Sequence, residues 1–394
     1  MDKPRYPCKP IGSIDVLATT LGVHKKKLID IASKVNSSYT SHELPKHPIT
    51  GKIRKVVDPK HELKKIQKRI NSRIFELVIF PPYLHGGIKA TSSIKRDYVE
   101  NASQHGHSQT LINLDVKNFY PNIKTNAVSG IFKYFFRFSD DVVEILTTLT
   151  TYNGSLPQGG CTSSYLANLV FFNTEYKLVS SFRGKAIRYT RLLDDITISS
   201  KNKIDSKSTT KIIQKVSAML RKNELSLKSN KTKISDRSEI HKEFEVTGLW
   251  VQPVNPQMRK KDVRHVRQLV FECEKLASKS KTSEDFHILW NKTSGLVAKL
   301  SRLNHSQAIS HRERLSNMLP EYDQEAQDKL VRSTNAALKV PVSSHSKWGV
   351  LKKYNLIIYN LGILARTNKI LSKKLRVSLK KHYSSVTTIS EYWG

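Results

Sequence analysis

An adjacent pair of aspartates, Asp194-Asp195, lies between two short apolar runs and limits what this chain can fold into. The runs at 186–192 and 196–199 have the length and the β-branched content that are typical of strands. Because so few residues separate them, we expect a hairpin with the acidic residues at or beside its turn. Adjacent carboxylates repel each other and are poorly hydrated between strands, so a divalent cation is their natural neutraliser.

A third aspartate has a similar setting, because Asp115 ends the apolar segment 110–114, which predicts a buried strand. Hard Mg²⁺ prefers one or two carboxylates together with substrate phosphates. That is the chemistry of two-metal phosphoryl transfer, in which one ion activates a 3′-hydroxyl and the other steadies the leaving pyrophosphate. Most Asp-Asp pairs are simple turn residues, so the interpretation depends on the motifs around them.

The charge of the chain supports a polyanionic partner. The sequence has 67 Lys and Arg against 33 Asp and Glu in 394 residues, a net charge of +34. An excess of this size usually persists where nucleic acid neutralises it. We find no apolar stretch of about 20 residues and no apolar signal core near the start, so we expect a cytoplasmic protein without membrane contact. The isolated Cys8, Cys161 and Cys273 are expected to be buried fillers.

Hydrophobic periodicity predicts the remaining elements. Helices are expected within 14–32, along the stripe from Leu63 to Val78, and at 142–151, 161–173, 208–222 and from 260 onward. Strands are expected at 51–57 and 244–251. The stripe of Tyr354, Ile357, Leu361 and Leu364 predicts core or partner contacts within the C-terminal region.

Several motifs stand in a fixed order along the chain. Asn-Leu-Asp-Val-Lys-Asn-Phe-Tyr-Pro at 113–121 precedes Leu-Pro-Gln-Gly at 156–159 with Leu-Ala-Asn-Leu at 166–169, and Tyr-Thr-Arg at 189–191 precedes the aspartate pair. Asn-Ala-Ser-Gln-His at 101–105 and Val-Thr-Gly at 246–248 flank this series. In these motifs the sequence resembles the bacterial retron-type reverse transcriptases, and more distantly the group II intron and retroviral enzymes, over roughly residues 14–310.

The sequence departs from that family pattern in three places. The usual Tyr-x-Asp-Asp is Leu192-Leu193-Asp194-Asp195 here, so the aromatic residue beside the primer terminus is missing. Cys161 and Tyr165 stand where the family commonly has prolines, and Ala-Thr-Ser-Ser at 90–93 replaces a basic, glycine-containing stretch. Both carboxylates of the third motif are retained, so phosphoryl transfer is expected, with altered primer positioning.

The resemblance implies an α+β chain with the right-hand polymerase fold. Its parts are fingers, a palm whose antiparallel sheet carries the catalytic aspartates, and a helical thumb. The corresponding boundaries are an N-terminal helical region at 1–50, fingers at 51–110, a palm with inserted fingers elements at 111–255, a thumb at 256–320 and a basic helical C-terminal extension at 321–394.

The resemblance also implies the residues of the polymerising site. Two Mg²⁺ ions, or Mn²⁺ in their place, are expected on Asp115, Val116, Asp194 and Asp195. The catalytic residues are expected to be the three aspartates and Lys231, which would give a proton to the departing pyrophosphate. The dNTP would be bound by Lys52, Arg54, Tyr120, Gln158 and Gly159, with the Tyr120 ring excluding a 2′-hydroxyl. The alternatives are a core role for Tyr120, a loop role for Gln158 and an ordinary surface role for Lys231.

A dedicated RNA is expected to contact a separate set of residues, Asn101, His105, Val246, Thr247 and Gly248. The alternatives here are that Asn101 and His105 brace a loop and that the Val-Thr-Gly segment is a strand and turn. The basic thumb is expected to grip duplex through its phosphates and A-form shape, without reading sequence.

The resemblance therefore implies an RNA-directed DNA polymerase that copies a dedicated non-coding RNA in antiphage defence. Its expected partners are this RNA as template and primer, the DNA product, dNTPs and an effector protein, while the oligomeric state is left open. Two alternatives stay open as well. One is a defence reverse transcriptase outside true retrons that makes repetitive or untemplated DNA, and the other is a non-catalytic RNA-binding scaffold with a polymerase fold.

Overall fold

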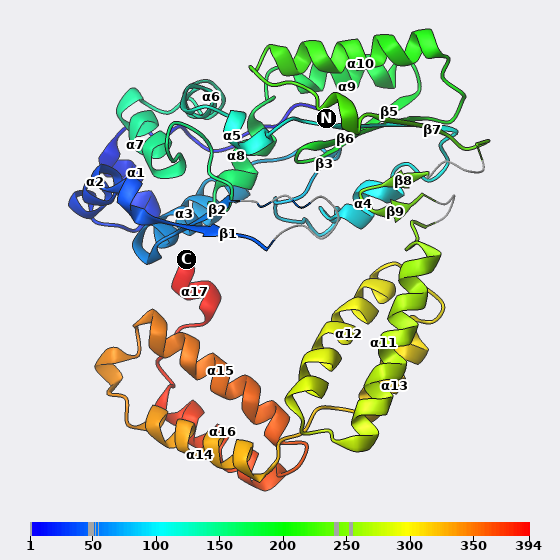
Figure 1. Ribbon diagram of the computed structural model, residues 1–394. Coiled ribbons are helices and arrows are strands. Elements are labelled where there is room, and N and C mark those ends of the chain that lie inside the picture. The colour runs from blue at the N-terminus through cyan, green and yellow to red at the C-terminus, as the bar shows by residue number, and fades with distance from the viewer. Residues whose placement is uncertain (1, 46–50, 52, 54, 240–243, 252–254) are drawn as a thin grey trace. The chain divides into compact units, whose positions relative to one another are not determined.

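The computed structural model describes residues 2–45, 51, 53, 55–239, 244–251 and 255–394 (Figure 1). The chain divides into two compact units, Met1–Pro256 with Gly394 and Gln257–Trp393. The residues predicted to bind nucleotide and metal all belong to the first unit. Its largest core contains the apolar residues of both the central sheet and the N-terminal helices.

A five-stranded sheet organises the first unit, with strand order β3-β5-β6-β4-β7. The β4–β6, β4–β7 and β5–β6 pairs are antiparallel, and only the short β3–β5 pair is parallel. The five strands are β3 (Leu84–His85), β4 (Thr110–Asp115), β5 (Ile187–Leu192), β6 (Asp195–Ser200) and β7 (Lys233–Asp236). The predicted β5–β6 hairpin and the buried strand before Asp115 are therefore present.

Strand alternation gives this sheet one apolar and one polar face. Ile112 pairs with Ile198 and Leu114 with Ile196, and all of these side chains are buried in the core. The residues between them point to the opposite face, so Asn113 lies opposite Thr197 and the Thr197 hydroxyl bonds Asn113 Oδ1 at 3.1 Å. The carboxylates at the ends of β4 and β6 share this polar face because the register is in phase with the alternation.

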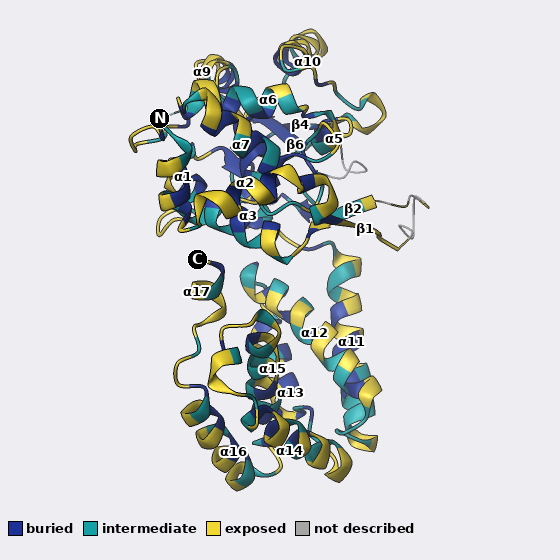
Figure 2. Cartoon of the chain, turned by 90° about the vertical axis from the view of Figure 1, so that its left-hand side faces the viewer, coloured by how far each residue is buried: buried dark blue, intermediate teal, exposed yellow. Residues whose placement is uncertain are grey.

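Helices α9 and α10 cover the apolar face of the sheet, and Figure 2 shows the dark blue buried strands β4 and β6 beneath the surface helices. On the other face α4 contacts β3 and β5. The helices of the first unit are α1 (Ile14–Leu21), α2 (Lys25–Ser33), α3 (His61–Arg73), α4 (Tyr98–Ser103), α5 (Phe119–Asn122), α6 (Thr125–Gly130), α7 (Asp140–Thr150), α8 (Ser163–Leu169), α9 (Glu175–Arg183) and α10 (Ser206–Arg221).

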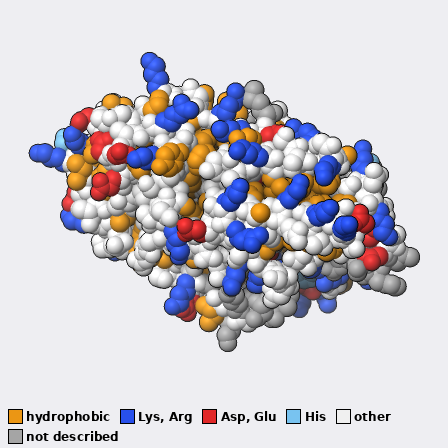
Figure 3. Space-filling model, turned by 90° about the horizontal axis from the view of Figure 1, so that it is seen from above, with side chains coloured by type: hydrophobic (Ala, Val, Ile, Leu, Met, Phe, Trp, Pro, Cys, Tyr) orange, Lys and Arg blue, Asp and Glu red, His pale blue; other side chains and the backbone are white. Residues whose placement is uncertain are grey.

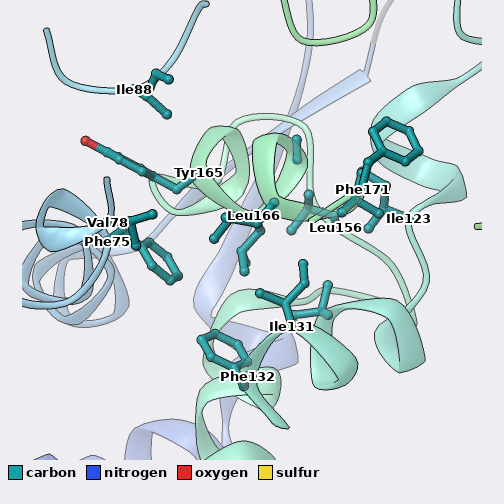
Figure 4. Close-up of a cluster of buried hydrophobic side chains, with 14 of the residues drawn as sticks. Phe75, Val78, Ile88, Ile123, Ile131, Phe132, Leu156, Tyr165, Leu166 and Phe171 are labelled. Atoms are coloured by element: carbon teal, nitrogen blue, oxygen red, sulfur yellow. The ribbon is translucent and has the colours of Figure 1, made fainter. Parts of the chain in front are cut away.

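The N-terminal helices pack around an aromatic cluster (Figure 4). In it the ring of Tyr165 stacks on Phe75 with 5.6 Å between ring centroids, and Phe132 packs 6.1 Å from the other side of Phe75. Tyr165 is one of the residues that replace a family proline, and its ring fills the space between α3 and α8. Its hydroxyl also accepts a hydrogen bond from the Lys89 amide at 3.2 Å.

Two hairpins complete the first unit. Strands β1 (Tyr39–Glu43) and β2 (Lys55–Pro59) pair as an antiparallel ribbon. The segment predicted as one strand at 244–251 is instead a tight hairpin of β8 (Glu245–Val246) and β9 (Leu249–Trp250). Thr247 and Gly248 both have positive φ, 47° and 80°, and this reverses the chain where a continuous strand was expected.

Two other sequence predictions are wrong in detail. The helix expected to run to Val78 ends at Arg73, because Ile74 leaves helical geometry (φ −126°) and Phe75–Leu77 form a 3-10 turn that exposes Leu77. Cysteine burial was also overestimated, since Cys273 is buried but Cys161 is only half-buried and Cys8 is exposed.

The second unit is helical throughout its described residues. Its helices are α11 (Lys260–Lys279), α12 (Glu284–Arg302), α13 (Ala308–Asn317), α14 (Gln324–Leu338), α15 (Trp348–Leu364), α16 (Lys369–His382) and α17 (Ile389–Trp393). Helices α11–α13 pack on one another, as do α14–α16. Ile357, Leu361 and Leu364 are buried in the core of the α14–α16 group and Tyr354 packs against it, so the predicted stripe makes core contacts.

Candidate active site

The β5–β6 hairpin brings the two adjacent aspartates to one end of the sheet. Leu192 pairs with Asp195, so Leu193 and Asp194 form the turn. Leu193 has φ 58°, a left-handed conformation that leucine rarely adopts. Such a residue persists only where its surroundings hold it, and here the Arg191 Nη1 donates to the Leu193 carbonyl at 3.2 Å.

Asp115 lies directly across the ladder from Asp195. The two are Cα partners at the last position of the β4–β6 pair, and strand partners of this kind have Cα atoms about 4.5–5.5 Å apart. One residue further on, the Val116 amide donates to the Asp194 carbonyl at 3.0 Å, which locks the turn against the end of β4. The structure therefore brings Asp115, Asp194 and Asp195 together from segments about 80 residues apart, as the motif order predicts.

The electrostatics of this group show crowding of like charge. Desolvation, followed by the charges of Asp194 and Asp115, raises the pKa of Asp195 to about 6, and the Lys231 ammonium opposes this shift. Lys231 Nζ lies 2.5 Å from the buried Asp115 Oδ1 and forms an ion pair with it. The crowded negative charge favours a cation beside these carboxylates, and the Lys231 ammonium is one such cation.

The donor set suits a hard divalent cation. Carboxylate oxygens are the ligands that Mg²⁺ prefers, and the buried Asp115 Oδ1, whose charge the Lys231 ammonium balances, is such an oxygen. Among the described residues, no group of three or more His, Cys, Asp or Glu side chains is placed so that it could hold a metal ion by itself. The arrangement instead fits the open kind of site at which substrate phosphates supply the remaining ligands.

A cavity of about 530 Å³ opens over these carboxylates. Its walls include Asp115, Asp195 and Lys231 from the sheet side and Thr247 and Gly248 from the β8–β9 turn. The Val-Thr-Gly element therefore shares a cavity with the acidic group, although Val246 itself is fully buried. The Thr247 hydroxyl donates to the Tyr98 carbonyl at 3.3 Å, and this fixes the turn at the cavity wall.

Tyr120 is half-buried on the four-residue helix α5, just after Asn118, whose φ is 45°. Burial raises the pKa of Tyr120, a hydrogen bond with the Ser164 side chain lowers it, and the charge of Asp194 raises it again. The phenol thus lies near both α8 and the catalytic turn, which is compatible with the predicted place of this ring beside the incoming sugar.

Position 159 needs a glycine because its backbone lies directly against β2. Its φ is 116°, and a Cβ atom at this position would lie 2.3 Å from the Val57 carbonyl oxygen. The Val57 amide also donates to the Gln158 carbonyl at 2.9 Å, so the Leu-Pro-Gln-Gly loop is held against the β2 backbone. The two other residues predicted to bind nucleotide, Lys52 and Arg54, lie outside the described residues.

Asn101 and His105 are fully buried rather than displayed at the surface. His105 Nδ1 bonds the Ser199 hydroxyl at 2.7 Å and Nε2 bonds the Thr190 hydroxyl at 2.8 Å, which ties the end of α4 to β5 and β6. Burial lowers the pKa of His105 to about 3, so the ring is neutral. As folded, neither side chain reaches solvent. The His105 ring braces the segment, whereas the Asn101 amide atoms are buried without a hydrogen-bond partner. The expected RNA contact by these two residues stays a prediction.

A buried ion pair that the sequence analysis did not predict lies behind the turn formed by Leu193 and Asp194. Arg191 Nε and Nη2 bond the Glu175 carboxylate at 2.6 and 2.9 Å, and both side chains are almost fully buried, with exposures of 0% and 3%. Arg191 also donates to the carbonyls of Ala167 and Asn168 on α8 and stacks 5.0 Å from the Phe171 ring. The available signal was an arginine at a core-facing position of a strand, because such a residue needs a buried acid.

This combination of sheet, turn and carboxylates defines a class of protein. Paired strands that place one carboxylate opposite an Asp-Asp turn, with a cavity above them into which Lys231 and Lys233 also face, form the palm of a template-dependent nucleic acid polymerase. Figure 3 shows Lys and Arg side chains spread widely over the face seen from above, with fewer acidic side chains among them.

Comparison with known proteins identifies the family. Residues 44–251 match the family model described as reverse transcriptase (RNA-dependent DNA polymerase). The chain is 40% identical to the retron Se72 reverse transcriptase of Salmonella heidelberg, over 96% of this chain and 98% of that protein. It is 31% identical to the retron Ec48 reverse transcriptase of Escherichia coli, over 92% and 90% of the two chains. The chain belongs to the reverse transcriptases of the bacterial retron type and is an RNA-directed DNA polymerase.

Among solved structures, the chain is similar to telomerase from Candida albicans in complex with a fragment of telomeric RNA, at a TM-score of 0.40 and 10% identity, covering 92% of this chain and 67% of that one. Apo telomerase from Candida tropicalis gives a TM-score of 0.40 and 12% identity, with coverage of 90% and 67%. None of the helices in the described part of the chain combines the length and the apolar character needed to cross a membrane.

Proposed function

We propose that this polymerase copies a dedicated non-coding RNA into DNA by two-metal nucleotidyl transfer and that the product serves antiphage defence. The observation that carries the proposed chemistry is the placement of Asp115 directly opposite Asp195, with Asp194 in the adjoining turn. The dedicated RNA is supported by the similarity to retron reverse transcriptases over nearly the whole chain. The defence role rests on the family resemblance.

The three carboxylates and the Val116 carbonyl would hold the metal ions. When bound, two Mg²⁺ ions would favour ionisation of the primer 3′-hydroxyl and neutralise charge on the leaving pyrophosphate. The raised pKa of Asp195 supports this assignment, because a site that crowds three carboxylates is stabilised by added positive charge. The β4–β6 ladder keeps Asp115 and Asp195 at a fixed separation and therefore pre-organises the oxygens.

The nucleotide would lie between this group and the Leu-Pro-Gln-Gly loop. Tyr120 would exclude a 2′-hydroxyl, because its phenol is held near Ser164 and Asp194 and has little freedom to move aside. Gln158 would contact the nucleotide from a loop that β2 fixes in place. Lys52 and Arg54, which the sequence places on one face of the strand region preceding β2, would clamp the triphosphate.

Lys231 would act as proton donor to the departing pyrophosphate. Its ammonium reaches into the carboxylate cavity, where it pairs with Asp115 at 2.5 Å while the side chain remains 53% exposed. A flexible, partly exposed lysine can exchange this partner for a phosphate oxygen, since both are anionic acceptors.

Primer extension on an RNA template tests the proposed chemistry. Asp194→Asn should slow extension at least about a thousandfold, because metal stabilisation of the transition state contributes several kcal/mol. Asp30→Asn is a matched control, since it removes an exposed carboxylate whose ionic partner among the described residues is Lys34, at the end of the same helix. Extension by Asp194→Asn at the rate of the wild-type protein would contradict the assignment.

One observation favours a second candidate, synthesis of repetitive or untemplated DNA. Leu192 stands where the family has tyrosine, and its side chain lies against Gly86, where an added Cβ would be 3.1 Å from the Leu192 Cδ1. Leucine offers no ring edge and no hydroxyl to a primer terminus.

Sequencing the nucleic acid that co-purifies with the protein separates the candidates. A branched RNA–DNA hybrid indicates a retron, a homopolymer or short repeat the second candidate, and RNA alone a non-catalytic scaffold.

A further inference from the structure

A second cavity, of about 430 Å³, lies at the other end of the β5–β6 hairpin from the carboxylates. Leu192 pairs with Asp195 at the catalytic end of this ladder, whereas Ile187 pairs with Ser200 at the opposite end. Five residues of strand separate these pairs, which corresponds to about 16 Å at about 3.3 Å per residue. We call this cavity the basic pocket, and its position separates it from the polymerising site.

Positive side chains dominate the polar part of the basic pocket. Arg183, Arg188 and Lys201 lie in its wall beside the polar residue His107, and no Asp or Glu is found among its described lining residues. The charge of Arg183 is balanced by Asp2, whose Oδ1 lies 2.5 Å from Arg183 Nη2. Arg188 and Lys201 therefore remain without a carboxylate partner among the described residues, which favours an anionic ligand.

The cations are positioned in different ways. Arg188 Nη1 donates to the Gln104 carbonyl, a neutral acceptor that orients the guanidinium without cancelling its charge. Lys201 follows the last residue of β6 and has no hydrogen-bond or ionic partner in the part of the chain that the structure describes. One oriented guanidinium and one free ammonium on neighbouring strands suit successive phosphates of a polynucleotide.

The remaining wall is aromatic and apolar. Tyr83 and Tyr189 pack edge to face with 5.8 Å between ring centroids, next to Val179 and Ile187. Both hydroxyls are already used, since Tyr83 donates to the Asp2 carbonyl at 2.8 Å and Tyr189 to Glu175 at 2.7 Å. Both rings are buried, with exposures of 4% and 3%, so they support the wall from behind. The cationic side chains at the pocket are the feature with which proteins track the backbone of a single nucleic acid strand.

The Asn101–His105 element leads directly into this pocket. His105 anchors the element to Thr190 and Ser199, and its neighbours Gln104, His107 and Ser108 form part of the pocket wall. The buried residues of the element thus hold its neighbours at the pocket. The Asn101–His105 element, for which RNA contact was expected, therefore lies beside a surface that could bind RNA.

We propose that the basic pocket binds the phosphodiester backbone of a single nucleic acid strand outside the polymerising site. The inference rests on the proposed function, because the dedicated RNA is the expected source of this strand and the DNA product is the other source. Arg188 and Lys201 would contact phosphates, while the partly exposed Ile187 side chain would contact the sugar.

Photocrosslinking tests the proposal on the full chain. The probes are a ten-uridine RNA and a ten-thymidine DNA, each with one 4-thio base, added with excess unlabelled primer–template duplex that fills the polymerising site. Crosslinks should map by mass spectrometry to peptides that contain Gln104 to Ser108 or Ile187 to Tyr189. The RNA probe reports the template as the source of the strand and the DNA probe reports the product.

Arg188→Gln with Lys201→Gln should weaken binding of the crosslinking probe about tenfold near 100 mM salt and reduce the slope of log K against log salt by about 1.4, at about 0.7 per lost contact. The matched control is Lys211→Gln with Lys215→Gln, two exposed residues of α10 outside the pocket. If the double variant does not fold, Lys201→Gln alone should reduce the slope by about 0.7, because this exposed side chain has no partner to lose.

Crosslinks confined to other peptides, or equal affinity and slope in the pocket and control variants, would overturn the proposal. Extension of a generic primed RNA template separates this outcome from failure of the proposed function. Pocket variants should extend the primer at the wild-type rate, whereas Asp194→Asn should not extend it.

Discussion

Replacing Glu175 by glutamine tests how the catalytic turn is held. Glu175 is the acid that compensates Arg191, and their side chains have exposures of 3% and 0%. Burial alone would lower the pKa of Arg191, but the Glu175 charge outweighs this effect and raises it. Glutamine has nearly the same shape, but it removes the negative charge and turns an amide donor towards guanidinium donors.

The expected loss follows from the burial of the pair. Breaking a buried ion pair by removing one partner costs about 3–5 kcal/mol, because the other charge stays buried without compensation. With a urea dependence of about 3 kcal/mol per M, the midpoint of unfolding should fall by about 1–1.7 M. The matched control is Glu62→Gln, whose partner is Lys27, because both side chains are more than half exposed, at 53% and 57%. It should cost at most about 1 kcal/mol.

The assay is urea unfolding followed by far-UV circular dichroism, together with primer extension at a temperature at which the variant is folded. Since Arg191 also bonds the Leu193 carbonyl, loosening it should displace the Asp194 turn and lower kcat by up to about a hundredfold, with little change in KM for dNTP. Adding Arg191→Met should recover part of the lost stability, because it removes the uncompensated charge. Equal midpoint shifts for Glu175→Gln and Glu62→Gln would refute this reasoning.

Three further predictions follow from individual residues. His105 is neutral in the folded protein, where its pKa is lowered to about 3. In the unfolded chain it takes up a proton near about pH 6.5. The contribution of His105 to the free energy of unfolding is therefore fully present above that pH, and it falls towards pH 3 by up to about 1.4 kcal/mol per pH unit. His105→Gln should reduce this slope in urea unfolding between pH 6.5 and 4, and an unchanged slope would contradict the assignment. Gly159→Ala should destabilise the first unit by more than Gly154→Ala, since both have positive φ but only at Gly159 would a Cβ meet the Val57 oxygen, at 2.3 Å; equal urea midpoints would show that this contact is unimportant. Tyr120→Ala should admit ribonucleotides in primer extension, and unchanged sugar discrimination would remove Tyr120 from the nucleotide site.

Local pattern was sufficient for most elements and insufficient for a few. The β5–β6 hairpin and the strand before Asp115 follow from short apolar runs and the turn between them, which are local properties. The end of α3 at Arg73 was missed because the apolar stripe continues past it, although Ile74 leaves helical geometry. The reversal at Thr247-Gly248 was missed because positive φ at a non-glycine residue depends on the surrounding contacts rather than on residue type.

The candidate site divides in the same way. The sequence identified Asp115, Asp194 and Asp195, because carboxylates in apolar settings are conspicuous in so basic a chain. It also placed His105 among RNA contacts, whereas the fold buries that ring between Thr190 and Ser199. Burial of this kind cannot be read from sequence, since a short polar motif looks the same whether it faces solvent or the interior.

The sequence by itself determined the chemistry that this protein can perform: the order of its motifs, its three carboxylates and the excess of positive charge around them. Only the tertiary structure decided the register that sets Asp115 opposite Asp195, the Arg191–Glu175 pair behind the turn and the pocket at the far end of the hairpin. The physical reason is that residue type and spacing act along the chain, whereas strand register, burial and charge pairing arise between segments about 15 to 80 residues apart.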